Sequence, residues 1–245
     1  TFDTNAVTLG RNSSKIGGAC VDATLDTEGI STTLVYVDGT QGWLVVNDGK
    51  QSEASTAQFV AATGGCISTC GDYKIHTFNS DANFVVSNAG NACGSNTVDY
   101  LVVAGGGGGG VCMGGGGGAG GYRESSGAAS GSYTRSPLGA CVSALPVSAS
   151  TYPITVGAGG AGSTSPCSAN PTPKGTPGST STFSTISSAG GGGGGSRNYG
   201  HLGLAGGSGG GNANDSPSSN VNPAGNTPPV SPPQGQPGGF GRGNT

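Results

Sequence analysis

The sequence offers few side chains that could perform catalysis. It contains two histidines, His76 and His201, and charged residues make up 9% of its 245 residues, against about 25% in ordinary domains. His76 lies in an alternating strand pattern, and His201 has no acidic residue close by in the sequence. The segments Gly105–Gly110 and Gly190–Gly195 match a phosphate-binding pattern only trivially, because no helical pattern follows either of them. We therefore expect a protein that is not an enzyme and that uses no cofactor and no metal.

Cysteine is the other reactive side chain, and the chain has seven: Cys20, Cys66, Cys70, Cys93, Cys112, Cys141 and Cys167. An odd number leaves one thiol free or joined to another chain. None of the spacings gives the Cys-x-x-Cys pairs of a zinc site. Cys66 and Cys70 would lie about 13 Å apart in an extended strand, so they can bridge each other only across a turn. They fit pairing with neighbouring strands, or burial as thiols, better.

Glycine and proline divide the chain into two parts. Residues 1–100 hold 12 of the 53 glycines and none of the 14 prolines. Neither part is basic enough to predict nucleic-acid binding, and no apolar run approaches the ~18–20 residues that a membrane span needs. The chain begins at Thr1 without a methionine, which favours a processed chain or a fragment of something longer.

The first part has the pattern of short strands. Apolar and β-branched residues alternate with polar ones and are separated by turn pairs such as Asp38-Gly39. We expect a small β module over residues 1–46, a linker over 47–58 and a strand anchor over 59–104. About 45 residues bury too little apolar surface to be stable alone, so the module needs a partner copy. The residues expected at that assembly interface are Val35, Val37, Trp43 and Leu44.

The second part repeats a glycine run, a polar loop and a short strand. Strands are expected at Val98–Ala104, which should be buried, at Tyr152–Val156 and at Ser181–Ile186. A flexible linker is one interpretation, because glycine-rich chains form random coils. Strands that lead regularly into the runs favour the other interpretation, in which the runs are ordered.

The ordered form that suits glycine is an extended left-handed helix with three residues per turn, polyglycine II. Without Cβ atoms, such helices can approach closely and exchange backbone hydrogen bonds. The predicted fold is thus all-β with little or no helix, a small β module followed by a polyglycine II sandwich or bundle over residues 105–216. The Pro-rich residues 217–245 are expected to form a tail or connector.

A bundle of this kind leaves its end loops free to vary, which makes them the candidate recognition surface. The expected loops are residues 122–133, 163–180 and 197–202. They and their flanks contain the aromatic and basic residue types favoured at binding hot spots. These candidates are Tyr122, Arg123, Tyr133, Arg135, Arg197, Tyr199 and His201.

Several segments resemble proteins of tailed phages, especially those of cyanobacteria and marine bacteria. Residues 8–16 (TLGRNSSKI), 33–38 (TLVYVD) and 42–44 (GWL) resemble a module of their tail-fibre proteins. The segments GDYKIHTF at 71–78, VDYLVVA at 98–104, GGYR at 120–123 and YPITVG at 152–157 resemble their glycine-rich, adhesin-type domain. This resemblance implies a polyglycine II sandwich whose end loops bind host surface structures.

We therefore expect a virion fibre or adhesin-like structural protein that attaches to a host cell surface and is located in a virion or outside cells. Its expected partners are further copies of itself as a trimer or polymer, other fibre proteins, and a host glycan or protein. No nucleic acid and no membrane insertion is expected. Two alternatives stay open: a self-assembling extracellular filament or capsid-decorating fibre, and an ice-binding or cell-wall glycine-rich protein.

Overall fold

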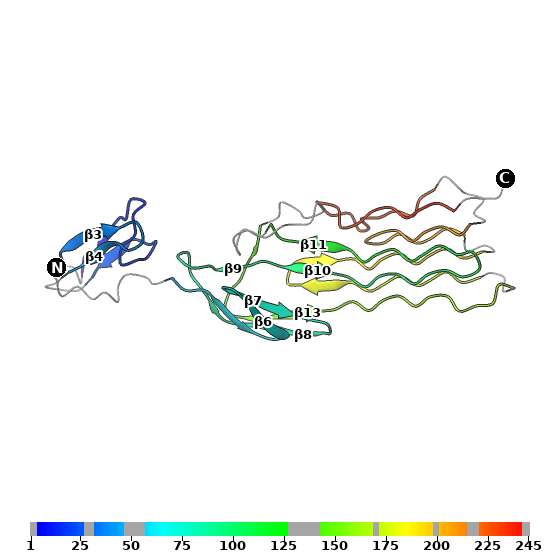
Figure 1. Ribbon diagram of the computed structural model, residues 1–245, viewed down its shortest axis with the longest axis horizontal. Helices are drawn as coiled ribbons and strands as arrows, with labels where there is room; N and C mark the ends of the chain where they lie inside the picture. The colour runs from blue at the N-terminus through cyan, green and yellow to red at the C-terminus, as the bar shows by residue number, and fades with distance from the viewer. Residues whose placement is uncertain are drawn as a thin grey trace. The chain divides into compact units, whose positions relative to one another are not determined.

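The computed structural model describes residues 4–26, 32–46, 57–126, 143–168, 172–197, 201–214 and 221–241 (Figure 1). These residues form strands and extended segments, and none of them forms a helix. The predicted all-β class is confirmed. Within these ranges there is accordingly no helix of the length and apolarity needed to cross a membrane. Four expected features lie outside the described residues: Tyr133, Arg135, Tyr199 and most of the linker over 47–58.

The strands are short, as the turn signals predict. Those of the first part are β1 (Val7–Leu9), β2 (Ala23–Leu25), β3 (Leu34–Asp38), β4 (Gly42–Val45), β5 (Val60–Thr63), β6 (Cys66–Cys70), β7 (Tyr73–Thr77) and β8 (Ala82–Ala89). Those of the second part are β9 (Thr97–Val98), β10 (Leu101–Val103), β11 (Tyr122–Glu124), β12 (Leu145–Pro146), β13 (Thr151–Thr155), β14 (Ser181–Phe183) and β15 (Ile186–Ser188). One sheet has five strands in the order β15-β14-β13-β8-β5, and the remaining strands form two-stranded pairs.

Two expected strands differ in the structure. The segment Val98–Ala104 breaks at Asp99 and Tyr100, and its strand β10 exposes Leu101 and Val103 while it buries Val102. It is a half-buried strand and not the fully buried one predicted. The segment Ser181–Ile186 folds into the hairpin β14–β15, because Ser184 adopts a positive φ of 52° and reverses the chain.

The chain divides into two compact units. Unit 1 comprises residues 1–62, 86–98 and 146–149, and unit 2 comprises residues 63–85, 99–145 and 150–245. In unit 1, the small β module pairs β1 with β2 and β3 with β4. Its buried apolar residues are Ile16, Ala19 and Ala23, which is a very small core for four strands.

Unit 2 has an aromatic core where its strands lie. Phe84 of β8 and Phe183 of β14 are buried, and their ring centroids lie 5.8 Å apart with the rings edge to face. Tyr152 of β13 contacts both of them at 6.1–6.4 Å. Edge-to-face aromatic pairs contribute about 0.5–1.5 kcal/mol beyond the area that they bury. This cluster fixes the strands from which the glycine runs extend.

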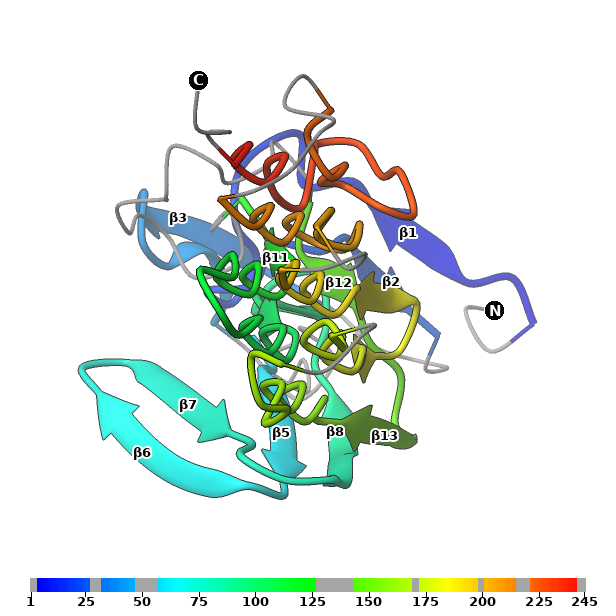
Figure 2. The same ribbon diagram turned by 90° about the vertical axis from the view of Figure 1, so that its right-hand side faces the viewer.

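The glycine runs of unit 2 are ordered and lie side by side. They comprise residues 104–110, 114–121, 157–163, 175–179, 189–196 and 203–213, and Figure 2, which looks along them, shows each as a narrow coil beside the others. Their backbone hydrogen bonds join different runs: Gly107 donates to Gly118 at 2.8 Å, and Gly191 donates to Gly105 at 2.9 Å. A linker of flexible glycine would not make such bonds.

Donors recur at every third residue along a run. The N–H groups of Gly105 and Gly108 donate to Ser179 and Thr176 at 3.0 and 2.9 Å. The same spacing separates the donors Gly107 and Gly110, Gly115, Gly118 and Gly121, Gly175 and Gly178, and Gly192 and Gly195. A period of three is what a helix with three residues per turn would produce. The polyglycine II conformation itself stays a prediction.

The innermost run shows why the residue must be glycine. Gly191 to Ser196 are all buried, so backbone fills the place that apolar side chains take in an ordinary core. None of the run glycines has a φ in the left-handed region, and backbone freedom is therefore not the reason for glycine. A Cβ at Gly192 or Gly193 would overlap the carbonyl of Leu204 or Gly175.

The run 157–163 carries side chains where it faces outward. Ala158 and Ala161 are exposed, whereas a Cβ at Gly157 or Gly160, on the same run, would overlap a neighbouring carbonyl. Gly106 is also open, since its Cβ would lie 3.6 Å from the nearest atom, the carbonyl oxygen of Gly118. In the run 157–163, the alanines therefore stand at positions that face outward.

The Pro-rich stretch forms a further layer of unit 2 and not a free tail. Gly209 donates to Gln236 at 2.9 Å, and Asn212 donates to Gly239 at 2.9 Å. Gln234 is 2% exposed. Proline lacks an N–H but keeps its carbonyl, and Pro223 uses that carbonyl to accept from Gly238 at 2.8 Å. The sequence-based expectation for residues 217–245 was wrong where the structure describes them, over 221–241.

Candidate functional site

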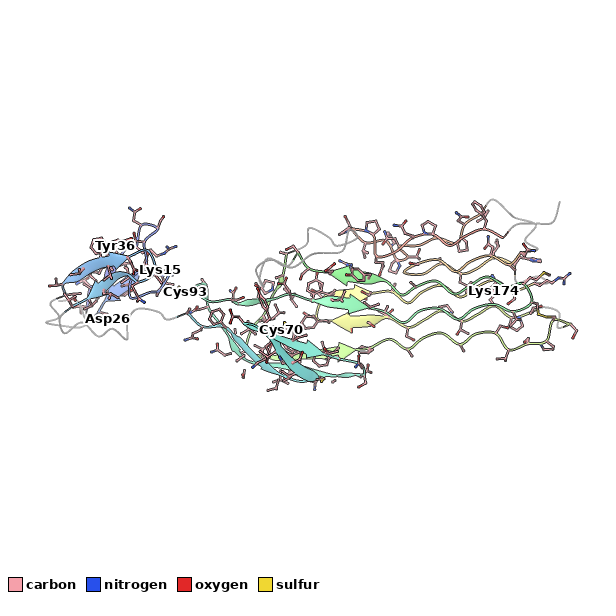
Figure 3. The ribbon with its side chains drawn as sticks, in the orientation of Figure 1. Lys15, Asp26, Tyr36, Cys70, Cys93 and Lys174 are labelled. Carbon is pink, nitrogen blue, oxygen red and sulfur yellow. A yellow bond between two sulfur atoms is a disulfide. The ribbon has the colours of Figure 1, made fainter. Side chains whose placement is uncertain are left out.

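Several loops of unit 2 meet at the end of the glycine runs remote from the β-strands. We call this the far-end surface; its described residues are 111–113, 163–168, 172–174, 196–197 and 201–202. It lies at the end that carries Lys174 in Figure 3. Backbone hydrogen bonds link the loops, since Asn214 donates to the carbonyl of Met113 at 2.9 Å and Ala213 donates to that of His201 at 2.7 Å. Loops from distant parts of the sequence therefore form one surface.

Ser196 holds two of these loops in place. Its hydroxyl accepts the N–H of Val111 at 3.0 Å and donates to the carbonyl of Pro173 at 2.7 Å. The residue has no exposed surface. A buried hydroxyl that satisfies both a donor and an acceptor is costly to remove, because each partner would then be left unpaired. Ser196 is thus a positioning residue for the far-end surface.

A disulfide provides the second constraint. Cys112 and Cys167 are bonded, with their Cα atoms 5.3 Å apart and a separation of 55 positions in the sequence. Cys112 and Met113 both have positive φ, at 59° and 60°, which non-glycine residues adopt infrequently. The tight turn at residues 111–113 is therefore pinned to the loop that follows Ser163. Sequence reasoning had left the pairing of the cysteines open.

The surface presents both basic and apolar groups. Arg197 is exposed, Lys174 and His201 are partly exposed, and Met113 is 52% exposed. Arginine recognises carboxylates and phosphates with paired hydrogen bonds, while lysine acts as a point charge. Such a surface can bind an anionic ligand.

Two of the predicted recognition residues lie elsewhere. Tyr122 and Arg123 belong to strand β11, which pairs with β10 in front of the run 104–110, so they lie at the opposite end of the runs from residues 111–113. The expected loop over residues 122–133 therefore begins as a strand. Tyr122 donates its hydroxyl proton to Glu124 at 2.9 Å. The structure separates this pair from Arg197 and His201.

The four predicted interface residues of unit 1 fall on two faces of the hairpin β3–β4. Val35 pairs with Leu44, and Tyr36 pairs with Trp43, so adjacent pairs point to opposite faces. Val37 lies at the bulge between Tyr36 and Asp38. Val35, Val37 and Trp43 are 46%, 53% and 39% exposed. Exposed apolar side chains of this kind are available for contact with a second copy of the chain. Their burial in an oligomer stays a prediction.

Sequence reasoning missed the polar residues that support the bundle. Asn212 is buried; its side chain accepts from Gly203 at 2.9 Å and donates to the carbonyl of Val221 at 2.8 Å. Gln234 accepts from Ala189 at 2.7 Å and donates to the carbonyl of Pro228 at 2.9 Å. Asn212 follows a glycine in the sequence and Gln234 precedes one, and this adjacency is the only signal that could have identified them. Polar residues of ordinary loops also lie beside glycine, so the signal is not specific.

No metal-binding group stands out. Over the described ranges, no three His, Cys, Asp or Glu side chains gather closely enough to hold an ion.

Comparison with known proteins places the second part of the chain. No curated protein and no solved structure matches it. The model of a family described as a glycine-rich domain matches residues 80–245. That match includes the aromatic core of unit 2, the glycine runs and the layer at 221–241, and it covers more than half of the sequence. The chain therefore belongs to this glycine-rich domain family.

Proposed function

We propose that this protein is a non-enzymatic fibre or adhesin-like protein of a virion, and that its far-end surface attaches to the surface of a host cell. The observation that carries the proposal is the contrast in unit 2 between the packed glycine runs and the exposed loops at their far end. The packed faces of its runs admit no side chain at positions such as Gly192, whereas the loops at the far end carry exposed side chains such as Arg197 and Met113. Variation that changes binding without harming the fold is confined to such loops.

The resemblance to phage tail-fibre proteins favours a location in a virion fibre. The basic residues of the far-end surface favour an anionic ligand. Arg197 and Lys174 favour carboxylate or phosphate groups of a cell envelope. Ser196 and the Cys112–Cys167 disulfide hold the loops before binding. A preorganised surface binds more tightly because less conformational entropy is lost on association.

A loop exchange tests the proposal. Residues 197–202 are replaced by a Ser/Gly segment of equal length, with Ser196 retained because it supports the fold. The purified full-length chain is labelled, and its adsorption to a panel of cyanobacterial and marine bacterial cells is measured together with its melting temperature. We expect adsorption to be lost while the melting temperature stays close to that of the unchanged protein.

Two further exchanges make the result specific. Replacing Ser184-Thr185, the turn of the hairpin β14–β15 at the strand end, by Gly-Ser should leave adsorption unchanged. A Ser/Gly exchange over residues 127–135 addresses the loop that the sequence marked as a second candidate. Loss of adsorption in that exchange alone would place recognition in the segment 127–135 and contradict the far-end proposal.

A filament or capsid-decorating fibre is the second candidate. The specific observation in its favour is the exposure of apolar residues on two-stranded hairpins, with Tyr36 and Val37 of β3 at 50% and 53% and Ile67 of β6 at 46%. Isolated two-stranded hairpins are marginally stable and favour association. Adsorption that survives both loop exchanges, together with polymers seen by electron microscopy, would favour this function.

A further inference from the structure

The hairpin β6–β7 stands by itself in unit 2. It forms a two-stranded sheet of its own with a two-residue turn, Gly71-Asp72, and Figure 2 shows it projecting from the body of the unit. All five residues of β6 are exposed. An isolated hairpin is marginally stable in water, and an unpaired strand edge is a template for pairing with another chain.

The two faces of the hairpin differ in what they contact. His76, which pairs with Ile67, lies with its ring 5.1 Å from that of Phe84 and at hydrogen-bonding distance, 2.8 Å, from the carbonyl of Gly64. The face of the hairpin that carries His76 is therefore turned toward the rest of unit 2. Because side chains alternate along a strand, the other face is turned away. It carries Cys66, Ser68 and Cys70 of β6 opposite Thr77, Ile75 and Tyr73 of β7.

Cys66 and Cys70 are both free and exposed (Figure 3 labels Cys70). They lie on one strand about 13 Å apart, far beyond the Cα separation of a disulfide, so they cannot bond to each other within one chain. The chain nevertheless forms a disulfide elsewhere, between Cys112 and Cys167, which belongs to an oxidising environment. Two exposed thiols on one strand would not persist there without partners.

The sequence of β6 has a two-fold pattern. It reads Cys-Ile-Ser-Thr-Cys, with a cysteine two residues to either side of Ser68. If two copies of β6 pair antiparallel about a two-fold axis at Ser68, then Cys66 of each copy lies opposite Cys70 of the other. Both thiols also lie on the same face of the joined sheet, because each is separated from Ser68 by an even number of residues.

The hydrogen-bond pattern of the hairpin allows this pairing. A two-residue turn closes on a hydrogen-bonded pair, here Cys70 and Tyr73, so residues 66, 68 and 70 direct their backbone groups to β7. Ile67 and Thr69 direct theirs to the free edge and can bond to a second copy. Cys66 and Cys70 would then form a non-hydrogen-bonded pair, with Cα atoms about 4.5 Å apart, within the range found in disulfides.

The residue composition of the two strands favours β6 over β7 as the edge that pairs with a second copy. Strand β7 carries Lys74 and His76, and charged residues, lysine above all, protect natural sheet edges from association. Strand β6 has no charged residue, proline or bulge. It therefore lacks the usual protection against pairing.

We propose that β6 is a self-association site, through which two copies of this chain pair antiparallel and are joined by two symmetry-related Cys66–Cys70 disulfides. Each bond forms from two thiols, which lose two electrons and two protons. A low-molecular-weight disulfide such as oxidised glutathione accepts them by thiol–disulfide exchange and leaves as two thiols. The partner is a second copy of this chain because the interface is self-complementary, as a two-fold contact requires.

The test uses the full-length chain, treated with oxidised glutathione and analysed by electrophoresis without reductant. We expect a covalent dimer that reverts to monomer on reduction. Equal amounts of unlabelled and ¹⁵N-labelled protein are mixed before oxidation, and the Cys66–Cys70 cross-linked peptide should then contain mixed isotopes. A monomer, a covalent trimer or cross-linked peptides found exclusively within one isotope would each overturn the proposal.

Cysteine variants make the register itself testable. The C66S variant and the C70S variant should each lose the covalent dimer, because each removes both bonds of the symmetric pair. Mixing C66S with C70S should restore it, since one copy then supplies Cys70 and the other Cys66. The C20S variant should dimerise like the unchanged protein. A covalent dimer formed by C66S alone, or none formed by the mixture, would contradict the two-fold register.

Discussion

The N–H of Gly118 donates a 2.7 Å hydrogen bond to the carbonyl of Gly192. The two residues belong to different runs, and the contact is possible because neither has a side chain. A Cβ at Gly118 would overlap the carbonyl of Ser208, and one at Gly192 would overlap that of Leu204. In this bundle, close contact between backbones replaces the packing of apolar side chains that stabilises other cores.

Neighbouring glycines of one run should respond oppositely to alanine. At Gly107 a Cβ would overlap the carbonyl of Gly192, whereas at Gly106 the nearest atom would be 3.6 Å away. Overpacking costs about 1–3 kcal/mol, so G107A should lower the free energy of unfolding by about that amount. The G106A variant should keep or slightly raise it, because alanine restricts the unfolded chain. Thermal melts of both variants check this, and equal melting temperatures would count against a packed backbone core.

The buried amide side chain of Gln234 helps to hold the layer at residues 221–241 against the runs. Gln234 accepts from the N–H of Ala189 at 2.7 Å and is 2% exposed. The Q234A variant leaves that N–H without this partner, which costs about 1–3 kcal/mol. Gln236 offers a matched control, since it is exposed and uses its backbone carbonyl to accept from Gly209. Urea titrations should show a lower midpoint for Q234A and an unchanged one for Q236A; similar midpoints would mean that the side chain of Gln234 does not stabilise the layer.

The fold was predictable where the signal was local. Alternating residues identified most strands, and the regular return of glycine runs between strands predicted ordered packing. The hairpin at Ser181–Ser188 was missed because its turn uses Ser184 with a φ of 52°, a conformation that residues such as glycine or asparagine normally mark. The Pro-rich layer was missed because proline lacks an N–H, although its carbonyl still accepts hydrogen bonds.

The candidate site was less predictable than the fold. Loop composition alone predicted Arg123 and Arg197 as members of one recognition surface, whereas the structure places them at opposite ends of the runs. Which loops share an end depends on how many runs lie between them and on the direction of each run. The pairing of Cys112 with Cys167 and the role of Ser196 depend on the same three-dimensional arrangement, and no spacing in the sequence encodes it.

Unit 1 should associate through the hairpin β3–β4. The β module buries three apolar residues, Ile16, Ala19 and Ala23, while Val35 and Trp43 stay exposed. Trp43 is the single tryptophan, so its fluorescence reports on this hairpin alone. We expect its emission to shift to the blue as protein concentration rises. The Y36D variant should abolish the shift, because Tyr36 pairs with Trp43 on the same face of the hairpin and burying an unpaired carboxylate is costly.

The control for this prediction is T40D, which adds the same charge in the exposed turn between the two strands. It should leave the shift intact. Emission that does not depend on concentration in the unchanged protein, combined with a monomer in sedimentation, would contradict association through this module.

Attachment through the far-end surface should depend on the charge of Arg197 and weaken with salt. Arg197 is exposed at the far end, whereas Arg123 lies half-buried in β11 at the strand end, which makes R123Q a matched control for R197Q. Losing one hydrogen bond to a charged group costs about 1.5–3 kcal/mol, or roughly a 10- to 100-fold loss of affinity. Added salt should reduce adsorption of the unchanged protein, because it screens exposed charges, and should reduce that of R197Q less. If R123Q weakens adsorption as much as R197Q does, or if salt has no effect, then the basic far-end surface is not what binds the cell.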